Sequence, residues 1–203
     1  DGLKVGGHQA SSASLVSVLT ALYFNYLDSE DRISIKPHAS PVFHAIQYLL
    51  GNLDESYLKK LREAGGLQSY PSRTKDPDSV DFSTGSVGLG AVAPLFAAVT
   101  RQYVDSHFGV RPKSRFISVI GDAELDEGNI WEALADPAAT HLGNVMWIVD
   151  FNRQSLDRII PGVRIEQWRA QFEAAGWHVK EVKYGSKLSQ VFKEDASLSF
   201  KQW

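Results

Sequence analysis

Residues 116–157 read FISVIGDAELDEGNIWEALADPAATHLGNVMWIVDFNRQSLD, and this stretch predicts the fold. Two short apolar runs, residues 116–120 and 145–149, flank a segment of helical character. Short apolar runs that alternate with helical segments are typical of βαβ units in a parallel sheet. We therefore expect an α/β fold of three layers, a mainly parallel sheet with helices on both faces. The two runs should be adjacent central strands.

Polar residues follow both apolar runs. Asp122 comes after the first run, and Asn152 follows the second run, 30 residues later in the sequence. Ligands bind beyond the carboxyl ends of parallel strands, and neighbouring strands would bring these two residues close together. A carboxylate and an amide oxygen are hard donors that suit Mg²⁺ or Ca²⁺, and Mg²⁺ typically completes its shell with phosphate oxygens and water. The pair therefore predicts a site for a metal and a diphosphate.

The order of these residues resembles the thiamine diphosphate signature of the transketolase superfamily. That signature is roughly GDG, an acidic residue with Gly, and a closing Asn on the next strand. The longer run GDAELDEG and the phrase NRQSLD look most like the homodimeric pyruvate dehydrogenase component and transketolase-like proteins. The resemblance extends from Gly6 to about Gly185 and implies the thiamine diphosphate-binding fold.

The resemblance also implies a cofactor site. It places the metal ligands at Asp122, Asn152 and the backbone carbonyl of Gln154, around Mg²⁺ (or Ca²⁺) that carries thiamine diphosphate. Gly121 and Ala123 belong to the same diphosphate-binding turn. Ala123 departs from the family pattern, which has a second Gly here whose amide approaches the diphosphate. We expect the Ala123 methyl group to crowd that approach.

Two histidines are candidates for proton transfer. His8 stands in GGH and His38 in KPHASPVFHA, at places where the superfamily carries histidines near the cofactor and the reacting carbonyl. The resemblance implies that both are catalytic and that His8 also lies near the diphosphate. The alternative for His8 is a loop histidine that caps the following helix. His44, inside a predicted helix, is interpreted as a packed histidine rather than a catalyst.

Residues 83–90, STGSVGLG, open a predicted helix that ends at about His107. A lone Gly-rich loop is weak evidence for phosphate binding, and a plain loop at a helix start is the alternative. This loop resembles the TG-x-x-G-x-G loop of the superfamily, which packs on the aminopyrimidine ring. The resemblance implies that Gly85 lets the backbone approach the ring and that Val87 stacks on it.

Three further positions bear on the substrate and the partner. Related sequences carry a histidine after the Pro of the loop at residues 65–73, and here that place holds Ser72. Arg73 is either a ligand for a carboxylate or phosphate, or an exposed loop cation. Glu127 resembles a glutamate at the interface between paired active sites, or it is an acid favoured by the helix dipole.

Hydrophobic spacing predicts the remaining elements. We expect helices over residues 14–27, 40–50, 53–64 and 165–175, short strands over residues 33–36 and 177–182, and a left-handed stop at Gly176.

Composition narrows the class of protein. The 203 residues are 43% hydrophobic and 22% charged, as in an ordinary globular domain. A formal charge of −3 argues against a nucleic-acid partner, and no apolar run is long enough for a membrane span. The chain has no Cys, which excludes disulfides and suits a reducing, cytoplasmic location. We expect residues 1–203 to be one thiamine diphosphate-binding domain, the diphosphate-binding half, from a longer protein.

The resemblance implies 2-oxo acid decarboxylation with acyl transfer, as in pyruvate dehydrogenase. A transketolase-like ketol transfer between sugar phosphates is the alternative. A non-catalytic assembly or regulatory subunit is a third reading, favoured by Ala123 and Ser72. The resemblance also implies a small-molecule substrate, a homodimer or a partner domain that completes the site, and a lipoyl carrier as acceptor. A nicotinamide site is set aside, because no G-x-G-x-x-G directly follows a strand.

Overall fold

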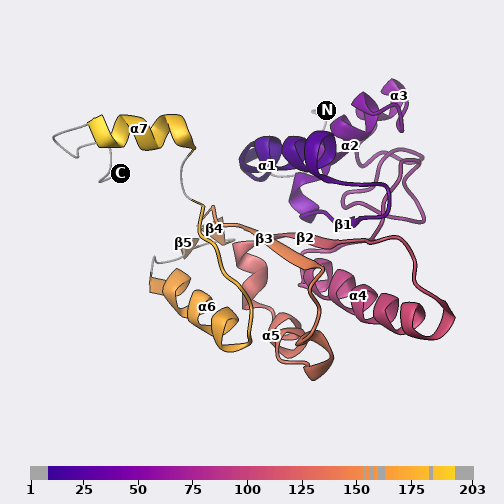
Figure 1. Ribbon diagram of the computed structural model, residues 1–203. Helices are drawn as coiled ribbons and strands as arrows, with labels where there is room; N and C mark the ends of the chain where they lie inside the picture. Colours follow the sequence, from indigo (N-terminus) through magenta and orange to yellow (C-terminus); the bar gives the residue numbers. More distant parts are fainter. Residues whose placement is uncertain (1–8, 153, 156–157, 160–162, 183–184, 195–203) are drawn as a thin grey trace. The chain divides into compact units, whose positions relative to one another are not determined.

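The computed structural model describes residues 9–152, 154–155, 158–159, 163–182 and 185–194 (Figure 1). The chain divides into two compact units, residues 1–165 and 166–203, which are described separately. Elements that lie in the first unit are α1 (Gln9–Ala21), a π-helical turn (Leu22–Tyr26), β1 (Arg32–Ser34), α2 (Ser40–Leu49), α3 (Glu55–Leu58), α4 (Leu89–Phe108), β2 (Phe116–Gly121), α5 (Gly128–Leu134), β3 (Val145–Asp150), β4 (Gln154–Ser155) and β5 (Arg158–Ile159). Helix α6 (Val163–Ala174) begins at the end of the first unit, and α7 (Ser186–Glu194) belongs to the second.

Three parallel strands form the central sheet in the order β1-β2-β3. Six residues of β2 pair in register with six of β3, from Phe116 with Val145 to Gly121 with Asp150. Every residue of β2 is buried, as expected for the central strand of a parallel sheet covered on both faces. The prediction of an α/β fold with these two runs as neighbouring strands is confirmed.

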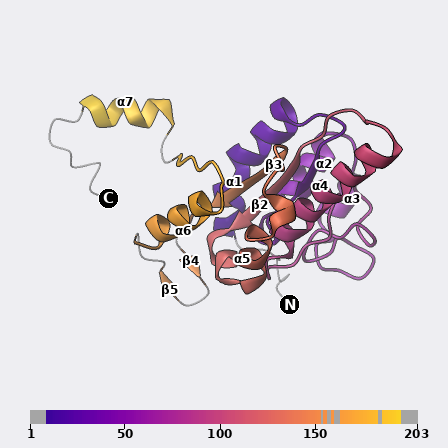
Figure 2. The same cartoon turned by 60° about the horizontal axis from the view of Figure 1, so that its bottom comes forward.

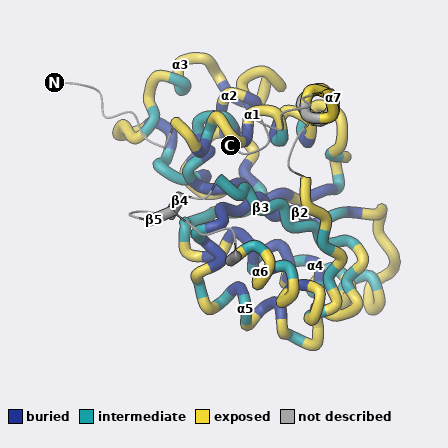
Figure 3. Tube along the Cα trace, turned by 90° about the vertical axis from the view of Figure 1, so that its left-hand side faces the viewer, coloured by how far each residue is buried: buried dark blue, intermediate teal, exposed yellow. Residues whose placement is uncertain are grey.

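Alternate residues of β2 face two different helical layers. Ile117 and Val119 join one hydrophobic core with residues of α1 and α2, including Leu19 and Phe43. On the other face Ser118 Oγ donates a hydrogen bond of 3.3 Å to the carbonyl of Ala91 in α4. Helices α4 and α5 therefore lie on one side of the sheet and α1 and α2 on the other (Figure 2). Strand β2 is the most deeply buried of the three strands, whereas every residue of β3 is half-buried (Figure 3).

The predicted helix over residues 53–64 is wrong. Only α3 forms, and the chain then turns back on itself between Lys60 and Leu67. Arg62 takes a left-handed φ of 65°, its amide donates to the carbonyl of Leu67 at 2.8 Å, and the Leu67 amide donates to Lys60. Burial of Leu67, which is 1% exposed, favours this turn over a longer helix.

The predicted strand over residues 177–182 is also wrong, since that stretch has no regular structure. Helix α6 does end at a left-handed Gly176, with a φ of 84°, as predicted. The amide of Trp177 then donates to the carbonyl of Phe172 at 3.0 Å, and the two rings meet edge to face at 5.9 Å. These contacts fold Trp177 back onto α6 instead of leaving it to extend as a strand.

The start of α4 generates a stability prediction. Gly88 has a φ of 84°, and a Cβ atom there would lie 2.2 Å from Oδ1 of Asn129. We expect Gly88→Ala to lower the free energy of unfolding by about 2 kcal/mol or more, from backbone strain and overpacking. The control is Gly128→Ala, where no atom lies within 4 Å of the added Cβ. Urea unfolding measures both, and equal stability of the two variants would contradict the prediction.

Candidate cofactor-binding site

The carboxyl edge of the sheet carries the predicted metal ligands. Strand β2 ends at Gly121 and β3 at Asp150, and these two residues pair in register. Asp122 and Asn152 therefore follow neighbouring strand ends by one and two residues. The backbone of Gln154 lies just beyond them in β4, so the three predicted ligands belong to one edge of the first unit.

A tight 3-10 turn at Asp122–Asp126 holds the carboxylate in place. Asp122 is 1% exposed, and its Oδ1 accepts the amide of Ala123 at 3.0 Å. The amide of Gly121 donates to Oε2 of Glu124 at 2.9 Å, which closes the turn from the other side. The backbone at Asn152 is also fixed by a local hydrogen bond, since its amide donates to the carbonyl of Asp150 at 3.1 Å. Local hydrogen bonds thus set the backbone after both strand ends.

The donor set at this edge fits a metal that arrives with a diphosphate. Among the described residues, no three His, Asp or Glu side chains converge on a common metal position. A metal at this edge would take one carboxylate, from Asp122, with an amide oxygen of Asn152 and the carbonyl of Gln154. Mg²⁺ commonly uses one or two protein carboxylates and fills its octahedron with phosphate oxygens and water. The residues present therefore fit Mg²⁺ bound through a diphosphate.

The Gly-rich loop lies close to this edge. A Cβ atom on Gly90 would lie 3.0 Å from Oγ of Ser34, the last residue of β1, so the loop packs on the strand end. The carbonyl of Val87 accepts Nδ2 of Asn129 in α5 at 3.0 Å. Val87 is 50% exposed, and a Cβ atom added to Gly85 would meet a methyl group of Val87 at 3.9 Å. An exposed apolar side chain on a fixed backbone is available to stack against a ring.

His38 lies in the 3-10 turn Pro37–Ala39, directly after β1. Its Nε2 is 3.4 Å from the hydroxyl of Tyr70, and the two rings meet edge to face at 5.6 Å. Sequence reasoning gave Tyr70 no role, because its loop is distant in the chain. The tyrosine hydroxyl restricts the orientation of the His38 ring.

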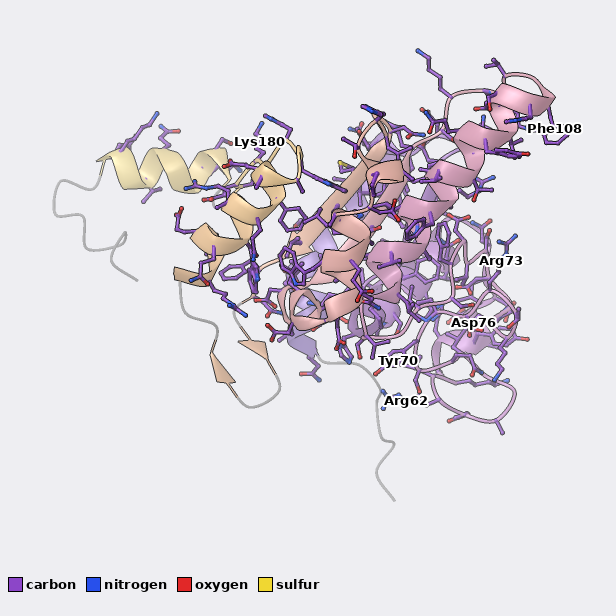
Figure 4. The ribbon with its side chains drawn as sticks, turned by 90° about the horizontal axis from the view of Figure 1, so that it is seen from below. Arg62, Tyr70, Arg73, Asp76, Phe108 and Lys180 are labelled. Atoms are coloured by element: carbon purple, nitrogen blue, oxygen red, sulfur yellow. The ribbon has the colours of Figure 1, made fainter. Side chains whose placement is uncertain are left out.

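The loop that carries Tyr70 is organised by Asp76, a buried acid that sequence reasoning also missed (Figure 4). Its two carboxylate oxygens accept the amides of Gln68 and Ser72, each at 2.7 Å. Arg73 is exposed and lines an open cavity of about 680 Å³ that Asp31 and Asp81 share. This cavity lies at the amino end of β1, opposite the edge of Asp122.

Other predicted positions are less central to this edge. His8 lies outside the described residues, and its catalytic role stays a prediction. His44 is 1% exposed, and its Nδ1 is 2.6 Å from Asp78, so it is a packed histidine as interpreted from the sequence. Glu127 directly precedes α5, at the position where an acid favours the helix dipole.

Lys36 is the main residue at this edge that sequence reasoning left without a role. It is 4% exposed, and its Nζ lies 2.7 Å from Oδ2 of Asp150. The signal in the sequence is a lysine between the apolar Ile35 and Pro37, both of them buried. Nearby, burial raises the pKa of the Glu124 carboxyl, whereas the amides of Gly121 and Gly88 and the charge of Lys36 lower it.

In open α/β sheets, ligands bind beyond the carboxyl ends of the strands, and this domain carries a carboxylate and an amide at that edge. The family described as transketolase, thiamine diphosphate binding domain, matches residues 18–198. The chain belongs to this family.

Relatives and solved structures agree with this assignment. The chain is 31% identical over 208 residues to the pyruvate dehydrogenase E1 component of Escherichia coli (strain K12), covering 96% of this chain and 23% of that protein. It is 31% identical over 209 residues to the same component of Mycolicibacterium smegmatis, covering 96% and 22%. Among solved structures, the transketolase from Leishmania mexicana matches with a TM-score of 0.75 and 25% identity, covering 93% of this chain and 31% of that one. The chain thus spans about a quarter of the length of the curated relatives it matches.

None of the described helices is both long and apolar enough to cross a membrane.

The raised pKa of Glu124 generates a prediction about pH. Above its ordinary value of 4.5, the unfolded chain releases this proton while the folded chain still holds it. The wild type should therefore lose stability relative to Glu124→Gln as pH rises through this window, by at most about 1.4 kcal/mol per pH unit. Gln keeps an oxygen to accept the Gly121 amide. Urea unfolding of both proteins from pH 4 to 7 measures the difference in stability. The same dependence of stability on pH in the two proteins would contradict the prediction.

Proposed function

We propose that this chain is the diphosphate-binding half of an enzyme that decarboxylates a 2-oxo acid and transfers the acyl group. The observation that carries the proposal is the registered pairing of β2 with β3, which sets Asp122 and Asn152 at one sheet edge in a chain of this family. Both pyruvate dehydrogenase relatives at 31% identity support the substrate class. Thiamine diphosphate, when bound, supplies a nucleophilic thiazolium carbon and an electron sink.

The chain's own residues would hold the cofactor from two sides. Asp122, Asn152 and the carbonyl of Gln154 would hold Mg²⁺ together with the diphosphate. The amides of Gly121 and Ala123 stand at the same turn, and the Ala123 amide already donates to Asp122. This hydrogen bond points the Ala123 amide at the carboxylate of Asp122. Gly85 and Val87 then form the surface on which the aminopyrimidine ring rests.

His38 is the described candidate for proton transfer. A histidine can exchange protons near neutral pH, and its turn directly follows β1 at the same edge as Asp122. The hydroxyl of Tyr70 holds the His38 ring through Nε2. His8 is proposed as the second proton-transfer residue on the resemblance alone, near the diphosphate.

A partner completes the site in this proposal. Glu124, which lies against the Gly-rich loop, is held by the amides of Gly121 and Gly88 inside this domain. We therefore propose that a second domain or a second subunit supplies the glutamate that reaches the aminopyrimidine ring, as part of a homodimer in the cytoplasm. The acyl group would pass to a lipoyl carrier.

Ketol transfer between sugar phosphates is the second candidate function. The solved structures most similar in fold include transketolases, among them one from Pichia stipitis in complex with fructose 6-phosphate, with a TM-score of 0.66 and 27% identity. Ser72 stands where related sequences carry a histidine, so this loop favours neither substrate class. A non-catalytic assembly subunit would keep the fold and lack turnover with either substrate class.

Asp122→Ala tests the metal site. The change removes the one charged ligand, so the affinity for thiamine diphosphate in the presence of Mg²⁺ should fall at least about 100-fold. Asp126→Ala is the matched control, because Asp126 is exposed in the same turn and should leave the affinity within about threefold. Isothermal titration measures both, and an Asp122→Ala protein with wild-type affinity would place the metal elsewhere.

A site shared with a second domain or subunit predicts low activity for residues 1–203 by themselves. A half-site lacks much of the contact area and preorganisation, so turnover of 2-oxo acids or ketose phosphates should be absent or very low. Addition of the missing domain, on the same or a separate polypeptide, should restore it. Decarboxylation and ketol-transfer assays at saturating cofactor and Mg²⁺ compare the two. Robust activity of residues 1–203 alone would refute the shared site.

A further inference from the structure

An open cavity lies at the amino end of β1, opposite the edge where the cofactor is proposed to bind. Its volume is about 680 Å³, within the range of sites that hold small molecules. The residues that line it belong to the first unit and have no part in the proposed function. The charged residues among them are Asp28, Asp31, Asp78, Asp81, Arg32 and Arg73. The cavity therefore offers charges of both signs to a ligand.

Asp78 is a buried acid in the wall of this cavity. Its side chain is 0% exposed, and its Oδ2 lies 2.6 Å from Nδ1 of His44. The other oxygen, Oδ1, is buried and makes no hydrogen bond with any of the described residues. A buried carboxylate oxygen without a donor costs free energy, and a ligand that brings a donor removes that cost. Asp78 therefore favours a ligand with a hydrogen-bond donor.

Asp81 presents a second acceptor to the same cavity. Its Oδ2 accepts the amide of Ile33 at 2.9 Å, whereas its Oδ1 is 3.8 Å from Nε of Arg32, beyond hydrogen-bond distance. Burial raises the pKa of the Tyr23 hydroxyl, and the charges of Asp81 and Asp78 raise it further. Both carboxylates thus act on one hydroxyl in the cavity wall, and an ammonium group placed there would be attracted by two acids.

The other two acids of the cavity are matched by Arg115. Its Nε donates to Oδ2 of Asp31 at 2.9 Å, and its Nη2 lies 3.1 Å from Oδ2 of Asp28. The backbone amide of Arg115 donates to Oδ1 of Asp31 at 2.7 Å. Asp31 is therefore saturated by donors of the protein itself. Asp78 and Asp81 carry the negative charge that remains for a ligand.

Arg73 supplies the opposite charge. Its backbone amide donates to Oγ of Ser83 at 3.0 Å, and its guanidinium makes no hydrogen bond or ion pair within the described part of the chain. Burial raises the pKa of the Asp81 carboxyl, whereas the amide of Ile33 and the charges of Arg32 and Arg73 lower it. The Arg73 charge therefore reaches Asp81 across the cavity. A guanidinium with open donors is suited to a carboxylate.

We propose that this cavity binds a small zwitterion of the free amino acid type, with its ammonium group against Asp78 and Asp81 and its carboxylate against Arg73. A ligand with one of these charges would leave the opposite group of the cavity unmatched. The inference goes beyond the proposed function and does not depend on it, because the cavity shares no residue with the cofactor site.

Four small probes test the charges that the cavity requires in the full-length protein. Glycine and 4-aminobutyrate carry an ammonium and a carboxylate at two different separations, whereas ethylamine and acetate carry one charge each. At least one zwitterion should bind at least about tenfold more tightly than either single-charge probe, because it matches both groups. Ligand-observed nuclear magnetic resonance titrations measure the affinities. No saturable binding of either zwitterion, or affinities no higher than that of ethylamine, would overturn the proposal.

Arg73→Gln tests the carboxylate end of the ligand. The variant should bind the better zwitterion at least about tenfold more weakly and keep the affinity for ethylamine within about threefold, since the carboxylate alone loses its partner. Lys75→Gln is the matched control, because Lys75 is an exposed cation of the same loop that does not line the cavity. The control should stay within about threefold of the wild type. Equal losses in the two variants would overturn the role of Arg73.

Asp81→Asn tests the ammonium end. Asn keeps a side-chain oxygen for the amide of Ile33 but removes the negative charge. The zwitterion and ethylamine should both bind at least about tenfold more weakly, whereas acetate should bind no more weakly than to the wild type. An unchanged affinity for the zwitterion would overturn the proposal. If Asp81→Asn does not fold, Arg73→Gln decides, because the substituted side chain lies at an exposed position.

Discussion

The structure depends on the parallel pairing of β2 with β3. Six registered residue pairs join the two strands, and β2 is buried along its whole length. This pairing sets the positions of α4 and α5 on one face and of α1 and α2 on the other, because alternate side chains of β2 enter two separate layers. It also brings Gly121 beside Asp150, so that the turn after one strand and the segment after the other meet at one edge.

An ion pair joins residues at the strand ends on each side of this sheet. At the amino end, Asp31 accepts the amide of Arg115 at 2.7 Å and its Nε at 2.9 Å, which ties the start of β1 to the residue before β2. At the carboxyl end, Lys36, two residues after β1, pairs with Asp150, the last residue of β3. Buried ion pairs are weak evidence for stability, because desolvation offsets the attraction. The pair of Lys36 with Asp150 joins strand ends at the edge where the candidate ligands lie, and the pair of Asp31 with Arg115 joins them at the opposite end.

In the proposed function, cofactor binding and substrate recognition fall on different segments. The residues assigned to the cofactor lie on short turns directly after strands or at the start of α4, where the backbone is fixed by hydrogen bonds. Tyr70, which contacts His38, and Ser72, which replaces the histidine of related sequences, lie in a long loop held by Asp76. Loops of this kind vary more easily than strand ends, since few core contacts depend on them.

The sequence by itself determined the fold class, the two central strands and the candidate ligands Asp122 and Asn152. These features are local: apolar runs of strand length and polar residues at their ends can be read without knowing any partner. Tertiary structure alone decided the turn after α3, the return of Trp177 onto α6, the contact of His38 with Tyr70 and the pair of Lys36 with Asp150. The last two join residues 32 and 114 positions apart. Burial and charge pairing at such distances depend on which segments the sheet brings together, and hydrophobic periodicity carries no information about that.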